Sequence, residues 1–258
     1  MNRISACLIT LNEEHNLARA LASLTGIADE IVVVDCGSQD RTLEIAQEHR
    51  AKIIKNAWKN FAEQKNVAAA AASNQWILSL DADEELSAAL RSSLLVWKET
   101  EPGHTVYEFA RRAWYLGDWI NHSGWYPDRQ RRVYRRDAAH FSGIVHESLK
   151  FQGQPGRLDG DLLHYTIRSF SEHEKKVERY TTLAAQQMYV AGRRSWRAAM
   201  WLATPWNWFN CYVLHLGFLD GARGWVIARM AARSTWLKFK KLGLLVQANR
   251  GIGEKKKA

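Results

Sequence analysis

Residues 76–83 read Trp-Ile-Leu-Ser-Leu-Asp-Ala-Asp, and this stretch decides the predicted fold. Its first five residues form an apolar run with the length and composition of a buried strand. Two carboxylates follow the run, Asp81 and Asp83. A continuing strand would place both on one face, because side chains alternate along a strand. Open α/β sheets bind ligands at the carboxyl ends of their strands, so the stretch predicts a central strand and a site beside it.

Apolar runs alternate with helical patterns on the amino-terminal side of this strand. The expected elements, in order, are strand 3–10, helix 13–24, strand 30–35, helix 38–48, strand 52–55 and helix 61–72. The run Glu-Ile-Val-Val-Val-Asp at 30–35 is nearly continuous and β-branched, as in a strand buried on both faces. Strands that alternate with helices predict an α/β fold, with a mostly parallel, Rossmann-like sheet, flanking helices and right-handed crossovers.

The pattern changes after Asp83. One more helix is expected at 87–98, and residues 104–150 are irregular and strand-like. Helical periodicity returns near residue 170 and persists to about residue 246. Breaks are expected at Pro205, Gly217, Gly221 and Gly224. The domains that follow are an α/β domain at 1–168, an amphipathic helical appendage at 169–250 and a basic tail at 251–258.

The net charge of +9 is concentrated toward the carboxyl terminus. Residues 193–258 hold 13 of the 36 Lys and Arg residues, two of the 27 acidic residues and six of the 12 tryptophans. Such a basic segment suits nucleic acid or an anionic membrane surface. Tryptophan together with Lys and Arg on apolar helices favours the membrane interface. We therefore expect an anionic membrane surface as a partner, and no nucleic acid.

Residues 198–219 contain no Asp, Glu, Lys or Arg, and these 22 residues are enough to cross a bilayer. Pro205, Asn207, Asn210 and His215 interrupt the stretch, and each polar group is costly in hydrocarbon. An amphipathic helix pair in the membrane plane, or docked on the domain, is therefore favoured over a full span. A plain helical subdomain, able to serve as a homo-oligomer interface, is the alternative.

The cysteines and the amino terminus indicate the compartment. The three cysteines are an odd number with no C-x-x-C spacing, which indicates reduced thiols rather than a disulfide framework or a zinc site. The first residues lead directly into a strand pattern and lack the shape of a signal peptide. Both features predict a protein on the cytosolic side.

Polar residues follow the first two predicted strands. Thr10 and Asn12 lie just past the first strand, and Asp35 ends the second. Adjacent strand ends form a crevice for a nucleotide base and ribose, and Asp35 can accept hydrogen bonds from uracil N3–H or ribose hydroxyls. The alternative is that Asp35 only caps the helix after Ser38.

Charged groups near the fourth strand extend this candidate site. Asp81 and Asp83 offer hard oxygen ligands that suit Mg²⁺ or Mn²⁺ held against a diphosphate, although a solvated acidic turn is the alternative. Lys65 lies on the preceding helix, whose end faces the same crevice. A lysine there would neutralise a diphosphate as a point charge, unless it is an ordinary solvated lysine.

Several motifs in order carry a family resemblance. The amino-terminal ones are Ile4-Ser-Ala-Cys-Leu-Ile-Thr-Leu-Asn-Glu-Glu14, Glu30-Ile-Val-Val-Val-Asp-Cys-Gly-Ser38 with Asp40, and Leu78-Ser-Leu-Asp-Ala-Asp-Glu84. The later ones are Phe61 with Gln64-Lys65-Asn66, Gly124-Trp-Tyr-Pro-Asp128, Phe141-Ser-Gly143 with Val145-His-Glu147, Gly160-Asp-Leu-Leu-His-Tyr165 and Leu216-Gly-Phe-Leu-Asp-Gly221. The first set resembles family 2 glycosyltransferases with the GT-A fold. The second set is similar to the bacterial lipopolysaccharide-core β-glycosyltransferases within that family.

The resemblance implies roles for individual residues. Asp83 would be the better metal ligand, while Asp81 would touch the ribose or a metal-bound water. His164 would be a further ligand of the metal or phosphate, with a core histidine as the alternative. Inverting transfer needs one base to deprotonate the acceptor hydroxyl, and Glu147 matches the position where the family keeps it. Asp128 is the next candidate, and a salt bridge to the neighbouring basic segment is the alternative role of Glu147.

Two further features bear on the substrates. Cys36 stands where many relatives carry a second acidic residue, which in some of them contacts uracil. Arginines alternate at 129, 131, 132, 135 and 136, in a pattern that suits phosphates of the donor or of an anionic acceptor. A solvated edge strand is the alternative explanation of the arginines.

The resemblance as a whole implies an inverting, metal-dependent hexosyltransferase. It would move glucose from UDP-glucose, a nucleoside diphosphate sugar, to a lipid-linked glycan such as lipopolysaccharide core. It would act as a peripheral protein at the cytoplasmic face of the bacterial inner membrane. Two rival functions remain: a nucleotidyltransferase on a related α/β sheet, and a non-catalytic basic adaptor for membrane or nucleic acid. A nucleotidyltransferase would require a Gly-rich, basic phosphate-binding loop after the first strand. The sequence has Thr10-Leu-Asn-Glu-Glu14 there, with acidic residues instead.

Overall fold

The computed structural model describes residues 1–143 and 147–255 of the chain, with side chains described as far as residue 249. The chain forms two compact units. The first, which we call the α/β unit, contains Met1–Arg112 and Pro127–Tyr165. The second, the helical unit, contains Ala113–Tyr126 together with the chain from Thr166 onward.

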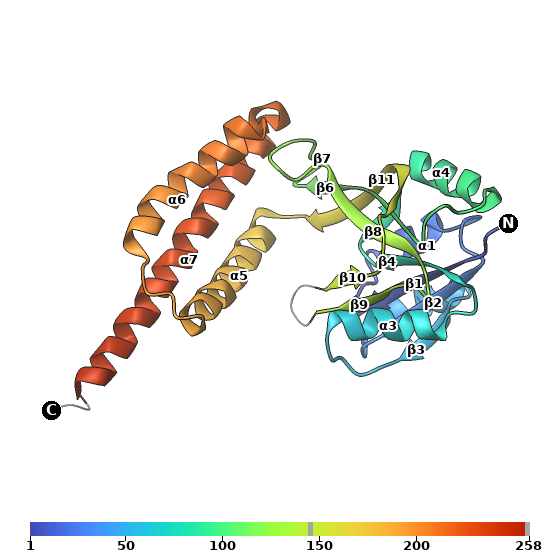
Figure 1. Cartoon of the computed structure of the whole chain (residues 1–258), viewed down its shortest axis with the longest axis horizontal. Helices are drawn as coiled ribbons and strands as arrows, with labels where there is room; N and C mark the ends of the chain where they lie inside the picture. Colours follow the sequence, from blue (N-terminus) through green and yellow to red (C-terminus); the bar gives the residue numbers. More distant parts are fainter. Residues whose placement is uncertain (144–146, 256–258) are drawn as a thin grey trace. The chain divides into compact units, whose positions relative to one another are not determined.

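The amino-terminal half of the α/β unit has the predicted alternation of strands and helices (Figure 1). Its elements are β1 (Ile4–Thr10), α1 (Leu17–Ser23), β2 (Glu30–Asp35), α2 (Thr42–Glu48), β3 (Lys52–Lys55), α3 (Phe61–Ala71) and β4 (Trp76–Asp81). The strands pair in parallel in the order β3-β2-β1-β4. The helix expected from Ser38 begins instead at Thr42, whose backbone N–H donates to the Asp40 carboxylate.

Antiparallel strands extend the same sheet beyond β4, in the order β8-β6-β11-β5. Their bounds are β5 (Glu84–Leu86), β6 (Val106–Tyr115), β8 (Asp128–Arg135) and β11 (Gly156–Ile167). Helix α4 (Ala88–Glu99) follows β5, and β9 (His140–Ser142) pairs with β10 (Ser148–Lys150) in a small separate sheet. The irregular segment 104–150 thus supplies most of the antiparallel strands. The predicted α/β class with a carboxyl-terminal helical appendage is confirmed, but the sheet is mixed rather than mostly parallel, because among the described strands only β3, β2, β1 and β4 pair in parallel.

Alternation along the central strands divides the core into two layers. Ile4 and Leu8 of β1 and Val33 of β2 pack in one layer, which α1, α2 and α4 cover. Cys7 of β1 and the β2 residues on either side of Val33 pack in the other layer, under α3 and the β9–β10 pair. The strands read as continuous apolar runs because both of their faces are buried.

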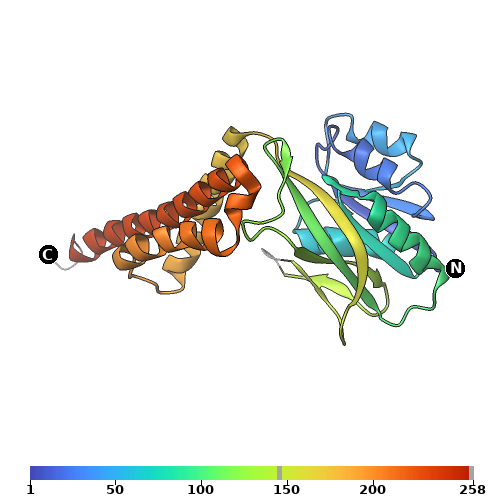
Figure 2. The same ribbon diagram turned by 90° about the horizontal axis from the view of Figure 1, so that it is seen from above.

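Three helices form most of the helical unit. They are α5 (Phe170–Val190), α6 (Arg197–Phe209) and α7 (Gly221–Lys255), with a π-helical turn η1 (Asn210–Leu214), a 3₁₀ turn η2 (Gly217–Asp220) and the short β7 (Asp118–Trp119). Helices α5 and α6 both pack along α7 (Figures 1 and 2). Apolar side chains from the three helices, among them Ala185, Met200 and Phe239, form their shared core.

Two of the helix breaks expected in this region, at Pro205 and Gly224, are absent. Helix α6 continues through Pro205. Gly224 likewise lies inside α7. The breaks expected at Gly217 and Gly221 are present: Gly217 follows Leu216, whose φ of +53° is left-handed, and Gly221, with a φ of +59°, is the first residue of α7, directly after η2. A further interruption separates α5 from α6. The expected tail at 251–258 is helical through Lys255, because α7 extends that far, and residues 256–258 lie outside the described residues.

The uncharged stretch 198–219 does not form one helix. It is divided among α6, η1 and η2, with the left-handed Leu216 before η2. Within residues 1–143 and 147–255, no helix combines the length and the apolarity that a membrane crossing requires. Asn207, which interrupts the uncharged stretch in sequence, donates hydrogen bonds to the Ala231 carbonyl at 3.1 Å and the Thr235 hydroxyl at 2.8 Å on α7.

Candidate active site

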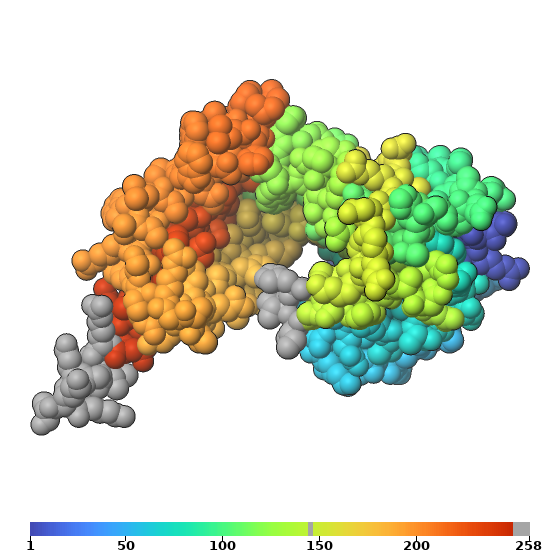
Figure 3. All heavy atoms as spheres, in the orientation of Figure 1, coloured from blue at the N-terminus to red at the C-terminus, as the bar shows by residue number. Residues whose placement is uncertain are grey.

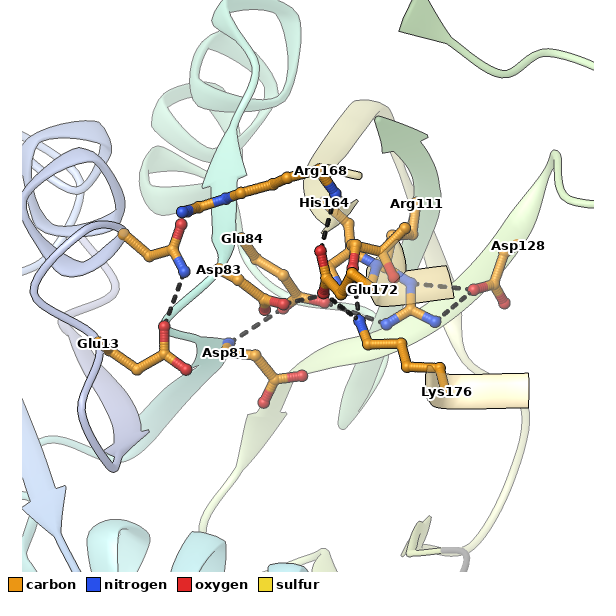
Figure 4. A network of polar contacts seen from close by, with 12 residues as sticks. Glu13, Asp81, Asp83, Glu84, Arg111, Asp128, His164, Arg168, Glu172 and Lys176 are labelled. Atoms are coloured by element: carbon orange, nitrogen blue, oxygen red, sulfur yellow. Dashed lines mark hydrogen bonds and ion pairs between the residues drawn. The ribbon is translucent and has the colours of Figure 1, made fainter. Parts of the chain in front are cut away.

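The site begins where the central strand β4 ends. Asp81 is the last residue of β4, and a two-residue turn of Ala82 and Asp83 leads into β5 at Glu84. The prediction that Asp81 and Asp83 share one face of a strand is therefore wrong, because the strand stops between them. In Figure 4 the two carboxylates lie in different places: Asp81 points away from the Asp83 side chain.

A buried lysine joins Asp81 to the candidate base. Asn60 caps α3 by accepting a hydrogen bond from the Glu63 backbone N–H at 2.9 Å, and the helix carries Lys65 toward β4. The Lys65 side chain is 5% exposed; its Nζ lies 3.0 Å from Asp81 Oδ1 and 3.2 Å from Glu147 Oε1. The structure thus brings together three residues that the sequence predicted for the site, and Lys65 is not a solvated surface lysine.

A β-bulge adds Arg132 to this cluster. Arg131 pairs with Glu108 of β6 while Val133 pairs with Tyr107, so Arg132 is the extra residue and has no partner on β6. Bulges re-aim side chains in this way beside active sites. Arg132 lies 2.6 Å from Asp81 Oδ2. Burial alone would raise the pKa of Asp81, but the charges of Arg132 and Lys65 outweigh burial and hold the pKa well below its usual range.

The buried carboxylate of Glu84 holds the arginines in place. Its side chain is fully buried, and its Oε1 lies 2.7 Å from Arg132 and 3.2 Å from Arg111. Its Oε2 accepts the backbone N–H of Asp81 at 3.0 Å. A buried charge needs partners of this kind, since an unpaired one is strongly destabilising. Glu84 therefore fixes the end of β4 and both arginines at once.

Asp128, the second candidate base, is occupied by the same network. Its Oδ2 accepts hydrogen bonds from Arg111 Nε at 2.9 Å and from a terminal nitrogen of Arg111 at 2.6 Å. Its Oδ1 accepts the side-chain amide of Gln130 at 2.8 Å. Dashed lines in Figure 4 trace the Arg111 contacts. Glu147 differs from Asp128, because among the described residues only its Oε1 has a polar partner, Lys65.

Asp83 and His164 form the pair that suits a metal. His164 lies on β11 opposite Glu84, and its Nε2 is 3.2 Å from Asp83 Oδ2. Both side chains are partly exposed, at 19% for His164 and 31% for Asp83. In the described part of the chain, no three His, Cys, Asp or Glu side chains group as a metal site. Two protein ligands fit Mg²⁺ or Mn²⁺, which take further ligands from phosphate and water. Asp81 fits less well, because Lys65 and Arg132 already face its oxygens.

Asp35 has no oxygen free of hydrogen bonds. Its Oδ1 accepts the backbone N–H groups of Gly37 at 2.8 Å and Ser38 at 2.9 Å, and its Oδ2 accepts the hydroxyls of Thr10 at 3.1 Å and of Ser38. Burial works to raise the pKa of Asp35, but these hydrogen bonds outweigh it and lower the pKa. Asp35 thus stabilises the loop after β2. This agrees in part with the alternative role of a helix cap, but α2 begins only at Thr42.

Asn12 ties the same loop to β1. It adopts a left-handed φ of +56°, donates its backbone N–H to the Ser38 hydroxyl at 2.8 Å and accepts the Gln39 N–H at 2.9 Å. A pocket of about 280 Å³ opens beside this loop, lined by Asp35, Cys36, Gly37, Ser38, Leu43, Lys55, Asn56 and Ala57. The cavity thus lies at the carboxyl ends of β2 and β3, rather than between the ends of β1 and β2 as the sequence predicted.

A second, more polar cavity of about 390 Å³ opens at the Lys65 cluster. Its lining consists of Lys65, Asp81, Arg111, Arg129, Gln130, Arg131, Arg132, Phe141, Glu147, Ser148 and Leu149. The candidate base is thus part of the wall of a cavity that ends against β4. Part of the same motif, Val145 and His146, lies outside the described residues.

The pairing of Glu84 with Arg111 and Arg132 was not predicted from the sequence, where Arg132 was only part of a basic stretch. One signal was available: Arg111 and Arg112 interrupt an apolar strand pattern, and charges inside such a strand require buried partners. Their partners could not be read from the sequence. Burial of Glu84 depends on β11 and β8, which are distant in sequence.

Comparison with known proteins places these features in a family. The family model described as Glycosyl transferase family 2 matches residues 5–150, which include β1 through the residues around Glu147. The lipopolysaccharide core biosynthesis glycosyltransferase LpsC of Rhizobium meliloti is 32% identical over 226 residues, or 84% of this chain and 82% of that protein. An uncharacterized glycosyltransferase of Rickettsia typhi is 28% identical over 264 residues, or 98% of this chain and 90% of that protein.

Similarity to solved structures is weaker. Crystal structures of glucosyl-3-phosphoglycerate synthase from Mycobacterium tuberculosis, one of them with Mn²⁺, UDP and glucosyl-3-phosphoglycerate, align with a TM-score of 0.36 and 22% identity. That alignment covers 45% of this chain and 45% of the solved chain, less than half the length of each. The family model and the relatives are the stronger matches, and by them the chain is a glycosyltransferase that belongs to glycosyl transferase family 2.

Proposed function

We propose that this glycosyltransferase moves a hexose from a nucleoside diphosphate sugar to a hydroxyl of a lipid-linked glycan, with inversion at the anomeric carbon. The proposed donor is UDP-glucose and the proposed acceptor is lipopolysaccharide core. One observation carries the proposal: Glu147 lines a polar cavity at the end of β4, and one of its carboxylate oxygens has no polar partner among the described residues. Similarity to LpsC supports the class of acceptor.

Glu147 is the proposed general base. Its free oxygen accepts the proton of the acceptor hydroxyl while that hydroxyl oxygen attacks the anomeric carbon. The bond from the anomeric carbon to the diphosphate oxygen breaks, and its electron pair leaves with the nucleoside diphosphate. Lys65 orients Glu147 through the 3.2 Å ion pair and links it to Asp81. Asp128 is the weaker candidate, since its carboxylate is already bound by Arg111 and Gln130.

Asp83 and His164 would hold the divalent cation, Mg²⁺ or Mn²⁺. When bound, such an ion offsets the negative charge that develops on the departing diphosphate. The 3.2 Å approach of His164 Nε2 to Asp83 Oδ2 supports a shared ligand position. Asp81, held between Lys65 and Arg132, is proposed to orient the sugar or ribose rather than to bind the ion.

The pocket beside Asp35 is the proposed site of the base and ribose. Thr10 and Asp35 stabilise the loop from within, and Asn12 fixes its outer side. With Asp35 engaged by its own loop, the groups left to contact the nucleotide are backbone atoms, Cys36 and the polar side chains of the rim. The proposed preference for uridine rests on the family.

The helical unit is proposed to hold the enzyme peripherally on the anionic cytoplasmic face of the inner membrane. Its large exposed apolar side chains, among the described residues, are Phe170, Tyr180, Leu183, Val190, Trp201, Leu202, Trp206, Phe209, Val213, Leu214, Leu216, Phe218, Leu219, Trp225 and Leu244. Large apolar patches on a soluble surface mark interaction sites, and Trp beside Arg and Lys suits the membrane interface. A homo-oligomer through the same helices is the competing use of this surface.

A donor screen tests the proposed activity. Purified protein is incubated with a panel of nucleotide sugars, Mg²⁺ or Mn²⁺, and truncated lipopolysaccharide, and both released nucleoside diphosphate and glycosylated lipid are measured. We expect UDP-glucose to be used, and Glu147→Gln to lower turnover by at least about a hundredfold with donor affinity retained. Asp128→Asn is the matched carboxylate control and should retain more activity. Release of the sugar 1-phosphate instead of nucleoside diphosphate would indicate nucleotidyl transfer and overturn the proposal.

A further inference from the structure

The polar cavity has a wall of arginines on β8. Arg129 and Arg131 are both exposed strand residues that line it, and the bulge turns Arg132 into the same space. In a regular strand, consecutive residues would point to opposite faces. The bulge therefore concentrates cations on one wall of the cavity, facing the space that Glu147 also lines.

These cations differ in how far the protein neutralises them. Lys65, Arg111 and Arg132 are all paired with carboxylates within the cluster. The Arg129 side chain lines the cavity and makes no hydrogen bond or ion pair with any described residue. Arg131 lies 3.8 Å from Glu108, but that carboxylate also faces Arg157 at 3.4 Å. Among the described cations of the cavity wall, Arg129 thus has no acidic partner and Arg131 shares one with Arg157.

Arg129 and Arg131 lie where they would contact the acceptor rather than the nucleotide. The pocket beside Asp35 lies at β2, and β1 and β4 separate β2 from β8 in the sheet order. Glu147 lines the arginine cavity, and a general base must contact the acceptor hydroxyl. If Glu147 is the base, as the proposed function holds, the acceptor enters this cavity.

We propose that Arg129 and Arg131 bind an anionic group of the acceptor glycan, a phosphate ester or a carboxylate, next to the hydroxyl that is glycosylated. The planar guanidinium binds both groups through paired N–H donors, and its weak hydration suits a partly enclosed site. The inference rests on the proposed function and adds a requirement to it: the enzyme selects an acceptor that is negatively charged near the reacting hydroxyl.

Acceptor kinetics test the inference. Truncated lipopolysaccharide is used native, after removal of its phosphates, and after reduction of its carboxyl groups, so that the two sources of negative charge are separated. We expect the native acceptor to be preferred over one of the two modified forms. Arg129→Gln, alone and with Arg131→Gln, should raise KM for the native acceptor about tenfold or more while KM for UDP-glucose stays unchanged. The same substitutions should leave KM for the disfavoured form unchanged.

Arg135→Gln is the matched control, because Arg135 lies on the same strand and pairs with Asp137 outside the cavity lining. It should leave every KM unchanged. Equal use of all three acceptors by the wild type, or an unchanged KM in Arg129→Gln, would overturn the inference while leaving glycosyl transfer intact.

A binding measurement separates this failure from failure of the proposed function. Inorganic phosphate is titrated calorimetrically into protein already saturated with UDP and Mg²⁺, so that the nucleotide site is filled. Phosphate binding that Arg129→Gln abolishes and Arg135→Gln retains supports the anion site, even if no acceptor is glycosylated. The anion site is refuted if the wild type does not bind phosphate and glycosylates charged and uncharged acceptors equally well.

Discussion

Asp81 and Asp83 show how two neighbouring carboxylates of one motif acquire different tasks. Asp81 is enclosed by Lys65 and Arg132, whereas Asp83 lies in the turn after β4 with His164 as its partner. The two carboxylates are similarly exposed, at 28% for Asp81 and 31% for Asp83, but Asp81 is paired with two buried cations and Asp83 with a histidine. Their substitution should accordingly separate stability from activity.

Asp83→Ala should abolish transfer, lowering turnover more than tenfold, with little change in thermal melting. The metal site loses a ligand, while the buried network keeps every member. Asp81→Ala is the comparison: it removes a shared partner of two buried cations and should lower the free energy of unfolding by about 3 kcal/mol. Turnover with Mn²⁺ and melting curves check both. Near-normal turnover in Asp83→Ala would refute the metal assignment.

Asp35 should make stability depend on pH. Its hydrogen bonds lower its pKa in the folded state, so near pH 4 the unfolded state binds more protons and acid favours unfolding. The contribution is fully present above the unfolded pKa of about 4 and is lost as pH falls toward the lower folded pKa. Asp35→Asn should cost about 2 kcal/mol at pH 7 and less at pH 3. Denaturant titrations at both pH values measure this, and a pH-independent difference would contradict it.

Among the elements, β11 and α4 approach each other closely at a glycine. Gly160 of β11 has a φ of +98°, and a Cβ there would lie 2.2 Å from the Leu90 backbone nitrogen of α4. Figure 2 shows the strand beside that helix. This contact positions β11, which carries His164 to Asp83. The glycine of the motif Gly160-Asp-Leu-Leu-His-Tyr165 thus allows β11 to lie against α4, and this position of the strand brings His164 to the site.

Gly160→Ala should lower the free energy of unfolding by about 3 kcal/mol, through left-handed backbone strain and a backbone clash that no side chain can relieve. Gly153→Ala is the control, since Gly153 also has a left-handed φ, +86°, but nothing lies within 4 Å of its added Cβ. It should cost only the strain, about 1 kcal/mol. Chemical denaturation measures the free energy of unfolding of both variants. Equal losses of this free energy would show that the close packing of Gly160 against α4 contributes nothing to the effect.

At the scale of the whole molecule, the helical unit carries an apolar surface that its own packing leaves uncovered. Met200 of α6 and Phe239 of α7 are buried between the helices, whereas Trp201 is 72% exposed and Trp206 is 60% exposed. Helix α6, orange in Figure 3, forms an outer surface of the unit with α7 partly visible behind it. Leu202, Trp206 and Phe209 follow the helical repeat and share that surface.

Binding to vesicles that contain phosphatidylglycerol should therefore weaken in high salt and persist in part. Salt screens the basic side chains, each worth about 1 kcal/mol near an anionic surface, but does not remove the apolar contribution. Trp201→Gln with Trp206→Gln should remove the salt-resistant part. Leu95→Gln with Val96→Gln, at exposed apolar positions of α4 in the α/β unit, is the control. Cosedimentation with the vesicles measures binding. If the protein does not bind at any salt concentration, self-association remains as the use of this surface. If alkaline carbonate fails to extract the bound protein, the helical unit is inserted into the membrane.

The sequence by itself determined the elements from β1 through β4, the helix α4, and the candidate residues at the ends of the strands; it did not predict β5. Local periodicity and turn chemistry decide where a strand or helix forms, and these signals are strong for the EIVVVD and WILSL runs. The family motifs added Glu147 and His164, which no local pattern distinguishes from ordinary surface residues.

Only the tertiary structure decided which charges are buried and paired. Glu84 meets Arg111 and Arg132 because β5, β6 and β8 belong to one sheet, and Arg132 reaches Asp81 because of a bulge. Strand order and register depend on contacts between residues far apart in sequence, which periodicity does not encode. For the same reason the turn between Asp81 and Asp83, and the passage of α6 through Pro205, became visible only in the folded chain.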